Sequence, residues 1–143
     1  MVQNIYNTSY TVSSRDFTNA GNASRKIKKT LQQIGIDNKV IRRVSIATYE
    51  AEMNIAIHSN GGEIFVTVDD HAITILSIDK GPGIENIALA MTEGFSTADK
   101  EIQEMGFGAG MGLPNMKFCA DNFEISSTID EGTNIRMYFK IRR

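Results

Sequence analysis

The segment Asp79–Gly83 is the feature that most constrains how this chain can fold. It follows the apolar, β-branched run Ala72–Ile78, which predicts a buried strand, and its sequence Asp-Lys-Gly-Pro-Gly cannot continue that strand. An acidic side chain is therefore placed at a strand terminus, before a loop whose glycines let a ligand approach the backbone. Two interpretations fit the segment: an ordinary turn initiated by an aspartate, or one edge of a binding site.

A second strand is predicted directly before this one. Residues 63–69 alternate between apolar and polar side chains, and a two-residue connection separates them from the strand at 72–79. The two strands should therefore form an antiparallel hairpin. Because side chains alternate along a strand, Asp79 shares the face of Ile73 and Ile75 and should point into the layer between sheet and helices.

Two amphipathic helices are predicted upstream of the hairpin. The first runs from Ser14 to Gly35, with Ser14 or Asp16 as its N-cap, because apolar residues recur there every three or four positions. The second starts near Asp37 and runs to about Ser59. The basic residues of the first helix are interpreted as a solvated face in preference to a binding patch: Arg25, Lys26, Lys28 and Lys29.

Glu50 and Asn54 lie one turn apart at the border of the apolar face of the second helix. A helix that only covered a core would carry its polar groups on the far side, so these two side chains need partners. A buried hydrogen-bond network or partial exposure would satisfy them, and so would a ligand.

The connection at 84–105 is long for a compact domain, and such connections are usually functional or mobile. It holds one short helical segment, at about 86–91, and leads to a turn at 106–112 with glycines at alternate positions. A helix from Leu113 to about Ala120 follows. Main-chain N–H groups of such a turn can hold an anion at the helix N-terminus, although a glycine-rich turn alone is a weak indication of phosphate binding.

Further strands are predicted at both ends of the chain. Residues 1–13 suit an edge strand or an extended arm, and strands follow at 123–128 and 133–143. In the last strand Thr133 shares the core-facing side of Ile135 and its alternate neighbours. Its hydroxyl should therefore lie beneath the helices, in the same layer as the Asp79 side chain.

Length and composition favour one ordinary globular domain. The chain has 143 residues, of which 41% are hydrophobic and 22% charged, and a formal net charge of −2 disfavours nucleic-acid binding. A single cysteine, Cys119, permits no internal disulfide, and the sequence shows neither a signal-peptide pattern nor an apolar run of membrane-spanning length. We expect a cytoplasmic protein.

The order of these features resembles the Bergerat, or GHKL, ATP-binding fold, which gyrase, heat-shock chaperones, histidine kinases and mismatch-repair ATPases share. The matching features span residues 37–143: Glu50-x-x-x-Asn54, Asp79-x-Gly81-x-Gly83, a long connection, a glycine-rich turn into a helix, and Gly132-Thr133. Within this group, Gly94-Phe95-Ser96-Thr97 and the segment 108–114 are similar to the bacterial anti-sigma-factor serine kinases and their stress-switch relatives.

The resemblance implies an α+β two-layer sandwich. Its sheet is mixed but mainly antiparallel, and about three helices cover one face. It also implies that residues 1–143 form a single ATP-binding domain, with an N-terminal edge strand or arm at 1–13 and an ATP lid at 84–105.

The resemblance also implies roles for individual residues. Asp79 would accept a hydrogen bond from the adenine amino group, helped by Thr133 through its hydroxyl or a water, and Asn54 would ligate Mg²⁺. Glu50 would be the general base that orients the attacking hydroxyl or water. The remaining implied contacts are Gly81 and Gly83 beside the base, Ser96 and Thr97 of the lid at the triphosphate, and Gly106, Gly108, Ala109, Gly110, Met111, Gly112 and Leu113 around the phosphates.

By resemblance, the expected function is that of an ATP- and Mg²⁺-dependent protein serine kinase. Its substrate would be a small antagonist protein of the STAS type, and a sigma factor would be a further partner in a switch that controls transcription or stress signalling. Self-association through the first strand is a further expectation. One alternative is a nucleotide-gated binding module that uses ATP or ADP and transfers little or no phosphate. A stand-alone ATP hydrolase is a third, less favoured alternative.

Overall fold

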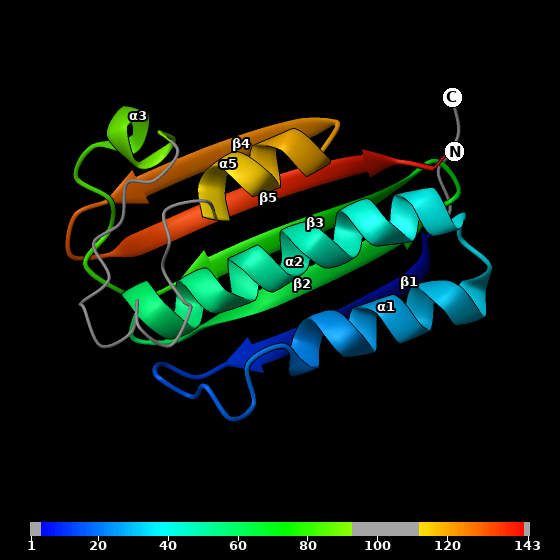
Figure 1. Ribbon diagram of the computed structural model, residues 1–143, viewed down its shortest axis with the longest axis horizontal. Coiled ribbons are helices and arrows are strands. Elements are labelled where there is room, and N and C mark those ends of the chain that lie inside the picture. Colours follow the sequence, from blue (N-terminus) through cyan, green and yellow to red (C-terminus); the bar gives the residue numbers. More distant parts are fainter. Residues whose placement is uncertain (1–3, 93–111, 142–143) are drawn as a thin grey trace.

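The computed structural model describes residues 4–92 and 112–141, which form two layers (Figure 1). One layer is a five-stranded sheet in the order β1-β2-β3-β5-β4. The helices α1, α2 and α5 pack against one face of it. In chain order the elements are β1 (Asn4–Val12), α1 (Asn22–Ile34), α2 (Asn38–His58), β2 (Gly62–Asp69), β3 (Ala72–Asp79), α3 (Ile87–Ala90), α5 (Gly112–Cys119), β4 (Asn122–Thr128) and β5 (Gly132–Lys140).

The sheet confirms the expected two-layer α+β fold class, but it is not mixed as expected: its described strands are all antiparallel. β2 and β3 form the predicted antiparallel hairpin. β1 lies at one edge, as predicted for the N-terminal segment, and β4 lies at the other. β5, the last strand in the sequence, pairs between β3 and β4 and so lies beside the strand that ends in Asp79.

The hydrophobic core lies between the helices and the sheet. α2 runs across the middle of the sheet, and Val44, Ala47, Ala51 and Ile55 on its inner side are completely buried. The alternate residues of the central strands face them, because a strand with one covered face buries every second side chain. These strand residues include Ile64, Val66, Val68, Ile73, Ile75, Met137 and Phe139.

The start of α1 differs from the prediction. The helix begins at Asn22, not near Ser14, and its N-cap Gly21 offers no side chain to the first turn. A carboxylate from another helix takes that place: Glu52 of α2, which is 2% exposed, accepts hydrogen bonds from Gly21 N and Ala23 N at Oε2 and from Ser24 N at Oε1, at 3.0, 3.1 and 3.0 Å.

The two residues expected to cap the first helix, Ser14 and Asp16, form hydrogen bonds elsewhere. The hydroxyl of Ser14, one expected cap, donates to the carbonyl of Ser59 at 2.7 Å, and Asp16, the other, accepts from Asn19 N at 3.2 Å. The segment therefore passes the C-terminal end of α2 and turns before the helix starts. The end of α1 at Gly35 and the start of α2 at its N-cap Asp37 are as predicted.

The remaining boundaries agree with the sequence to within a few residues. Helix α3 has Asn86 as its N-cap, β5 ends at Lys140, and residues 142 and 143 are outside the described part. Among the described helices, none is long and apolar enough to cross a membrane.

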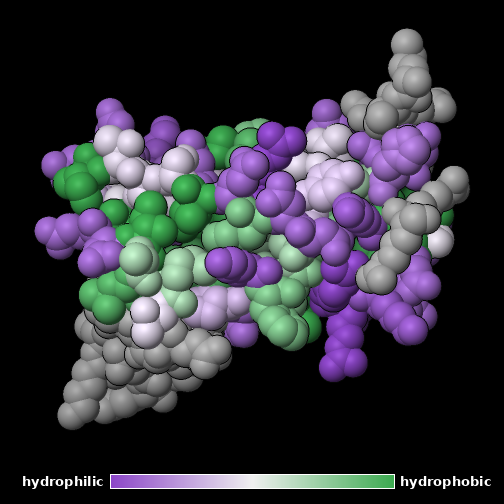
Figure 2. All heavy atoms as spheres, turned by 90° about the horizontal axis from the view of Figure 1, so that it is seen from above, coloured by the Kyte–Doolittle hydropathy of each residue, from purple (hydrophilic) through white to green (hydrophobic). Residues whose placement is uncertain are grey.

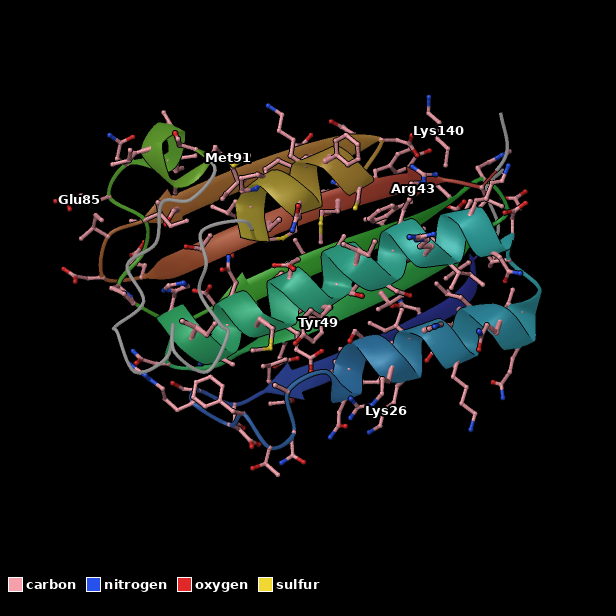
Figure 3. All side chains as sticks on the ribbon, viewed as in Figure 1. Lys26, Arg43, Tyr49, Glu85, Met91 and Lys140 are labelled. Carbon is pink, nitrogen blue, oxygen red and sulfur yellow. The ribbon has the colours of Figure 1, made fainter. Side chains whose placement is uncertain are left out.

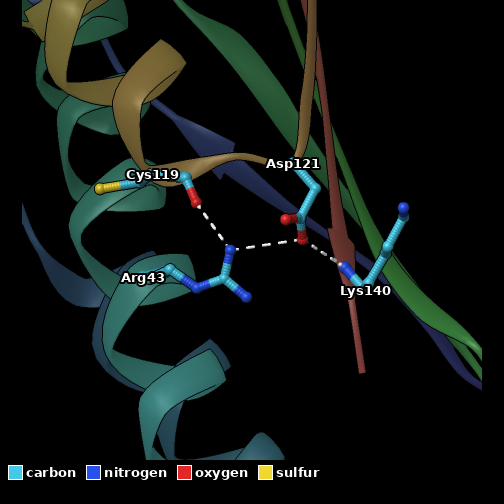
Figure 4. A network of polar contacts seen from close by, with 4 residues as sticks. All are labelled: Arg43, Cys119, Asp121 and Lys140. Carbon is cyan, nitrogen blue, oxygen red and sulfur yellow. Dashed lines mark hydrogen bonds and ion pairs between the residues drawn. The ribbon is translucent and has the colours of Figure 1, made fainter. Parts of the chain in front are cut away.

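A polar network fixes the C-terminal end of α5 to both layers (Figure 4). The Arg43 guanidinium of α2 donates to the carbonyl of Cys119 at 3.2 Å and forms an ion pair with Asp121 at 3.3 Å. The same Asp121 oxygen accepts from Lys140 N of β5 at 2.7 Å. Burial raises the pKa of Asp121, but the Lys140 N–H and the Arg43 charge outweigh that effect and hold the pKa below its ordinary value.

Hydrophobic side chains also gather on the surface near α3. Figure 2 views the molecule from the side of α3, α5 and β4. Hydrophobic side chains lie toward the end that carries α3, whereas hydrophilic side chains dominate the opposite end. Leu89 of α3 is 43% exposed, and Ile129 in the turn between β4 and β5 is 51% exposed. An apolar surface thus flanks the end of the sheet where β3 terminates and β5 begins.

Candidate functional site

Asp79 is the last residue of β3, and its carboxylate is oriented by the adjacent strand. Its Oδ1 accepts a hydrogen bond from Thr133 N at 3.0 Å. Gly132 has a φ of +135°, and a Cβ there would overlap the carbonyl oxygen of Asp79, so only glycine allows this approach of β5 to β3. Burial raises the pKa of Asp79, while the Thr133 N–H acts in the opposite direction.

Thr133 lies beside this carboxylate and is 6% exposed, as its place in the strand alternation predicts. Its Oγ1 is 2.9 Å from Oγ of Ser127 on β4. The Ser127 Oγ also accepts from Ile84 N at 2.7 Å and lies 3.1 Å from the carbonyl of Gly132. A hydroxyl pair therefore connects the site of Asp79 to the backbone that follows Gly83.

The turn after Asp79 is held between α2 and the β4–β5 turn. Asn60 N donates to the carbonyl of Lys80 at 2.6 Å, which links the turn to the end of α2. A Cβ on Gly81 would lie 3.0 Å from Cα of Ser59. Gly83 has a φ of +80°, and a Cβ there would lie 2.6 Å from the carbonyl oxygen of Thr128. The sequence predicted that Gly83 lets a ligand approach the backbone. In the structure, the absence of a side chain at Gly83 also lets the Thr128 backbone pack against it.

Glu50 and Asn54 of α2 lie together at the N-terminus of α5. A Cβ on Gly112, the first residue of α5, would lie 3.3 Å from Glu50 Oε2 and 3.6 Å from Asn54 Oδ1. Both side chains are half-buried. Burial raises the pKa of Glu50, and a hydrogen bond from the side chain of Asn115, also on α5, partly lowers it. The two polar residues at the border of the apolar face therefore meet the helix that follows the glycine-rich turn.

Glu50 also lines a groove of about 350 Å³ between α1 and α2. Tyr49 projects from α2 on the side of α1 (Figure 3) and lies close to Gly21. The Ser45 hydroxyl is buried without a hydrogen-bond partner in the described residues. Besides Glu50, the groove is lined by two cations, two large apolar side chains and two serines: Arg25, Lys28, Ile46, Tyr49, Ser24 and Ser45.

The donor groups suit a magnesium–nucleotide complex. Asn54 offers a carboxamide oxygen, and hard oxygen ligands are those that Mg²⁺ prefers. Residues 4–92 and 112–141 contain no group of three or more histidine, cysteine, aspartate or glutamate side chains that could hold a metal ion.

The structure brings together part of the predicted site. Asp79 with Gly81, Gly83 and Thr133 forms one cluster, and Glu50 with Asn54, Gly112 and the buried Leu113 forms another. The other predicted contacts lie outside the described residues: Ser96, Thr97, Gly106, Gly108, Ala109, Gly110 and Met111, with the greater part of the lid at 84–105.

Two residues of structural consequence, Ser127 and Glu52, are absent from the sequence predictions. Ser127 alternates with Ile125 and so shares the inward side of β4, which is a signal that period two could have supplied. Glu52 is flanked at helical spacing by the buried small residues Thr48, Ala56 and Ser59. Such a stripe indicates that another backbone packs closely, but not that its N–H groups need a carboxylate.

Comparisons with known proteins were consistent with one another. Residues 14–139 match the histidine kinase-like ATPase domain. The serine/threonine-protein kinase RsbT of Bacillus subtilis is 32% identical over 119 residues, which cover 80% of this chain and 84% of that protein. The anti-sigma F factor of Caldanaerobacter subterraneus subsp. tengcongensis is 36% identical over 102 residues, or 68% of each chain.

Among solved structures, the mycobacterial sensor histidine kinase MprB has a similar fold. The TM-score is 0.55 at 18% identity, and the match covers 94% of this chain and 99% of that one. At this identity the similarity concerns the arrangement of helices and strands alone.

Proposed function

Because this chain belongs to the histidine kinase-like ATPase domain family, we propose that it is an ATP- and Mg²⁺-dependent protein serine kinase of the anti-sigma regulatory type. The observation that carries the proposal is the meeting of Glu50 and Asn54 with the first residue of α5. Nucleotide binding does not require a carboxylate at this position. Transfer of a phosphoryl group to a hydroxyl does benefit from a general base there.

The adenine base is assigned to the cluster at the end of β3. The Thr133 N–H holds Oδ1 of Asp79 and thereby orients the carboxylate, whose second oxygen accepts from the adenine amino group. The Thr133 hydroxyl lies next to it for a further contact, directly or through a water. Gly81 and Gly83 keep side chains out of the turn beside the base.

The triphosphate is assigned to the region between Asn54 and the N-terminus of α5. Asn54 would hold Mg²⁺ through Oδ1, and the bound cation would neutralise charge on the phosphates. Main-chain N–H groups from Gly106 to Leu113 would hold the phosphate oxygens, with Ser96 and Thr97 reaching them from the lid.

Glu50 is the group assigned to the acceptor hydroxyl. Its carboxylate lies between the N-terminus of α5 and the groove along α1, so a hydroxyl that enters by the groove reaches Glu50 opposite the phosphates. There the carboxylate can orient the hydroxyl and accept its proton. Burial raises the pKa of this carboxyl, which favours acceptance of a proton, whereas a cation bound at Asn54 would lower it.

The protein partner is proposed to be a small antagonist domain of the STAS type that carries the acceptor serine, with a sigma factor as the second partner. The support is the similarity to RsbT, named a serine/threonine-protein kinase, and to proteins named anti-sigma F factor. The cytoplasm is the compartment in which such partners would meet. Self-association through the edge strand β1 stays a prediction.

The test is transfer of labelled phosphate from ATP to candidate antagonist domains. Glu50→Gln should reduce transfer at least about a hundredfold while leaving the Kd for ATP within about threefold, because the base acts on the acceptor and not on the nucleotide. Glu63→Gln, on the exposed side of β2, is the matched control. Transfer that survives Glu50→Gln would contradict the role of this carboxylate.

A second function, nucleotide-gated binding without transfer, is favoured by the similarity to proteins named for an anti-sigma activity. It predicts that the affinity for a partner differs between the ATP-bound and ADP-bound protein while no phosphate reaches the partner. Labelled ATP and the candidate antagonist domains distinguish the two functions, because only a kinase labels the partner.

A further inference from the structure

Helices α2 and α5 run antiparallel and meet through polar groups near both ends of α5 (Figure 1). At the C-terminal end of α5, the Arg43 guanidinium of α2 donates to the carbonyl of Cys119 at 3.2 Å. At the other end, Gly112 lies against Glu50 and Asn54. Arg43 and Glu50 are seven positions apart, as are Gly112 and Cys119, which corresponds to about 10 Å along each helix axis. The Arg43 contact and the assigned phosphate site are therefore the two ends of one helix pair.

Arg43 is itself held by the sheet. Asp121 Oδ2 lies 3.3 Å from Nη1 of Arg43 and accepts from Lys140 N of β5 at 2.7 Å (Figure 4). Asp121 N donates to the carbonyl of Tyr138, also on β5, at 2.8 Å. Arg43 thus joins α2, the last turn of α5 and the sheet at one point. Its charge also lies at the C-terminal end of α5, which is the negative end of the helix dipole.

Helix α5 contacts the core through apolar side chains. Leu113, Met116 and Cys119 are its buried residues. Apolar packing holds the helix against α2 and the sheet, but it is not directional and tolerates small shifts of the helix along its axis. A charged donor bonded to one particular carbonyl fixes that position, and setting the register of neighbouring elements is the best-attested role of such polar contacts.

We propose that Arg43 is a positioning residue, which fixes α5 along α2 so that the N-terminus of α5 lies opposite Glu50 and Asn54 in the position that binds the phosphates. This inference rests on the proposed function and adds to it the residue that sets the geometry of the phosphate site. Arg43 acts through the carbonyl of Cys119 and has no assigned contact with the nucleotide.

A small shift of α5 would affect the phosphates and not the base. Sliding the helix by one residue moves its first N–H groups by about 1.5 Å, which is more than a hydrogen bond tolerates. The adenine base is assigned to Asp79 and Thr133, at the ends of β3 and β5, which are held by their own hydrogen bond. Loss of the Arg43 contact should therefore weaken the binding of ATP more than the binding of adenosine.

The test compares a ligand that carries phosphates with one that lacks them. Calorimetry with Mg²⁺ measures the Kd of ATP, and an NMR titration measures the Kd of adenosine, for the full chain, Arg43→Met and Arg43→Lys. The control Arg42→Met removes the same charge from the adjacent, exposed position of α2. Circular dichroism and thermal unfolding confirm that each variant folds.

In Arg43→Met, the preference for ATP over adenosine should fall about tenfold, while the Kd of adenosine stays within about twofold of that of the unchanged protein. Arg43→Lys should keep the preference within about threefold, because both contacts of Arg43 come from the single nitrogen Nη1, which an ammonium can replace. Arg42→Met should leave the preference unchanged. A role of Arg43 in stability alone would lower the melting temperature of Arg43→Met without changing the preference, and that result would overturn the inference.

An equal loss of preference in Arg42→Met and Arg43→Met would also overturn the inference while the proposed kinase stands, since it would show an effect of charge alone. Absence of ATP binding by the unchanged protein would remove the proposed function and the inference with it. If Arg43→Met does not fold, Asp121→Asn takes its place, because the amide keeps an oxygen for Lys140 N but loses the charge that holds Arg43. Its preference for ATP should fall at least about threefold, and an unchanged preference would contradict the role of Arg43.

Discussion

At the scale of the residue, Asp79 illustrates a conflict between stability and binding. Its carboxyl is half-buried and accepts the Thr133 N–H, yet burial is the larger effect and raises its pKa. The folded protein therefore holds this proton to a higher pH than the unfolded chain does. As the pH rises through the ordinary range of an aspartate and then through the raised pKa, this residue lowers the free energy of unfolding.

We predict that Asp79→Asn stabilises the nucleotide-free protein at pH 7 and weakens ATP binding. The amide keeps an oxygen for Thr133 N but carries no charge to desolvate, so the variant should unfold at a higher temperature than the unchanged protein. The difference should shrink as the pH falls below about 4, where an aspartate is protonated in both states. The Kd for ATP should rise about 10- to 100-fold, because the NH₂ of the amide faces the adenine amino group.

Thermal unfolding between pH 3 and 8, with calorimetry of ATP binding, measures both effects. Asp70→Asn in the β2–β3 turn is the matched control. A variant that binds ATP normally would show that the base is not recognised at Asp79, and one that is less stable at pH 7 would show that the Thr133 hydrogen bond outweighs desolvation.

At the scale of the element, the start of α1 depends on a side chain of α2. The first N–H groups of a helix have no partners within it, and here Glu52 accepts from three N–H groups at that end. Its negative carboxylate is also suited to the positive end of the helix dipole. The two helices are therefore joined by a buried polar contact in addition to their apolar packing.

Glu52→Gln should lower the free energy of unfolding by about 2–4 kcal/mol, because the amide NH₂ replaces one acceptor and leaves a buried N–H unpaired. Urea unfolding measures the loss, and hydrogen exchange at Gly21, Ala23 and Ser24 should show that protection is lost first at this end of α1. Glu63→Gln, exposed on β2, should cost less than about 0.5 kcal/mol. Equal stability of the two variants would contradict the capping role of Glu52.

At the scale of the whole molecule, the assigned nucleotide joins the two layers. Its base would contact the ends of β3 and β5, and its phosphates would lie against α2 and α5, so unfolding of either layer requires loss of the ligand. ATP with Mg²⁺ at a hundred times its Kd should raise the free energy of unfolding by about 2.7 kcal/mol. For a chain of this length that corresponds to a shift on the order of 10 °C in the midpoint.

Thermal unfolding at increasing ATP concentration measures the shift. GTP should give a much smaller shift, and ATP should stabilise Asp79→Asn less than the unchanged protein, because both changes remove the match at the base. Equal stabilisation by ATP and GTP would indicate that the phosphates alone are bound.

Along the chain, local patterns determined most of the elements. Apolar periodicity predicted α2 from its N-cap Asp37, the β2–β3 hairpin and the helix after the glycine-rich turn, because these signals lie within a few residues of one another. The same alternation placed Asp79 and Thr133 on the covered side of the sheet, and the structure confirms that the Asp79 carboxylate meets the Thr133 N–H.

The tertiary structure decided what depends on partners distant in the sequence. Helix α1 starts at Asn22 because Glu52, 30 positions later, supplies its cap, while Ser14 and Asp16 bond elsewhere. Likewise Ser127 became part of the site only when β5 paired between β3 and β4 and brought Ile84 and Thr133 to the same hydroxyl. Periodicity shows which face of an element is buried, but which backbone donor a buried oxygen meets is set by how the elements pack, and a local pattern carries no record of that.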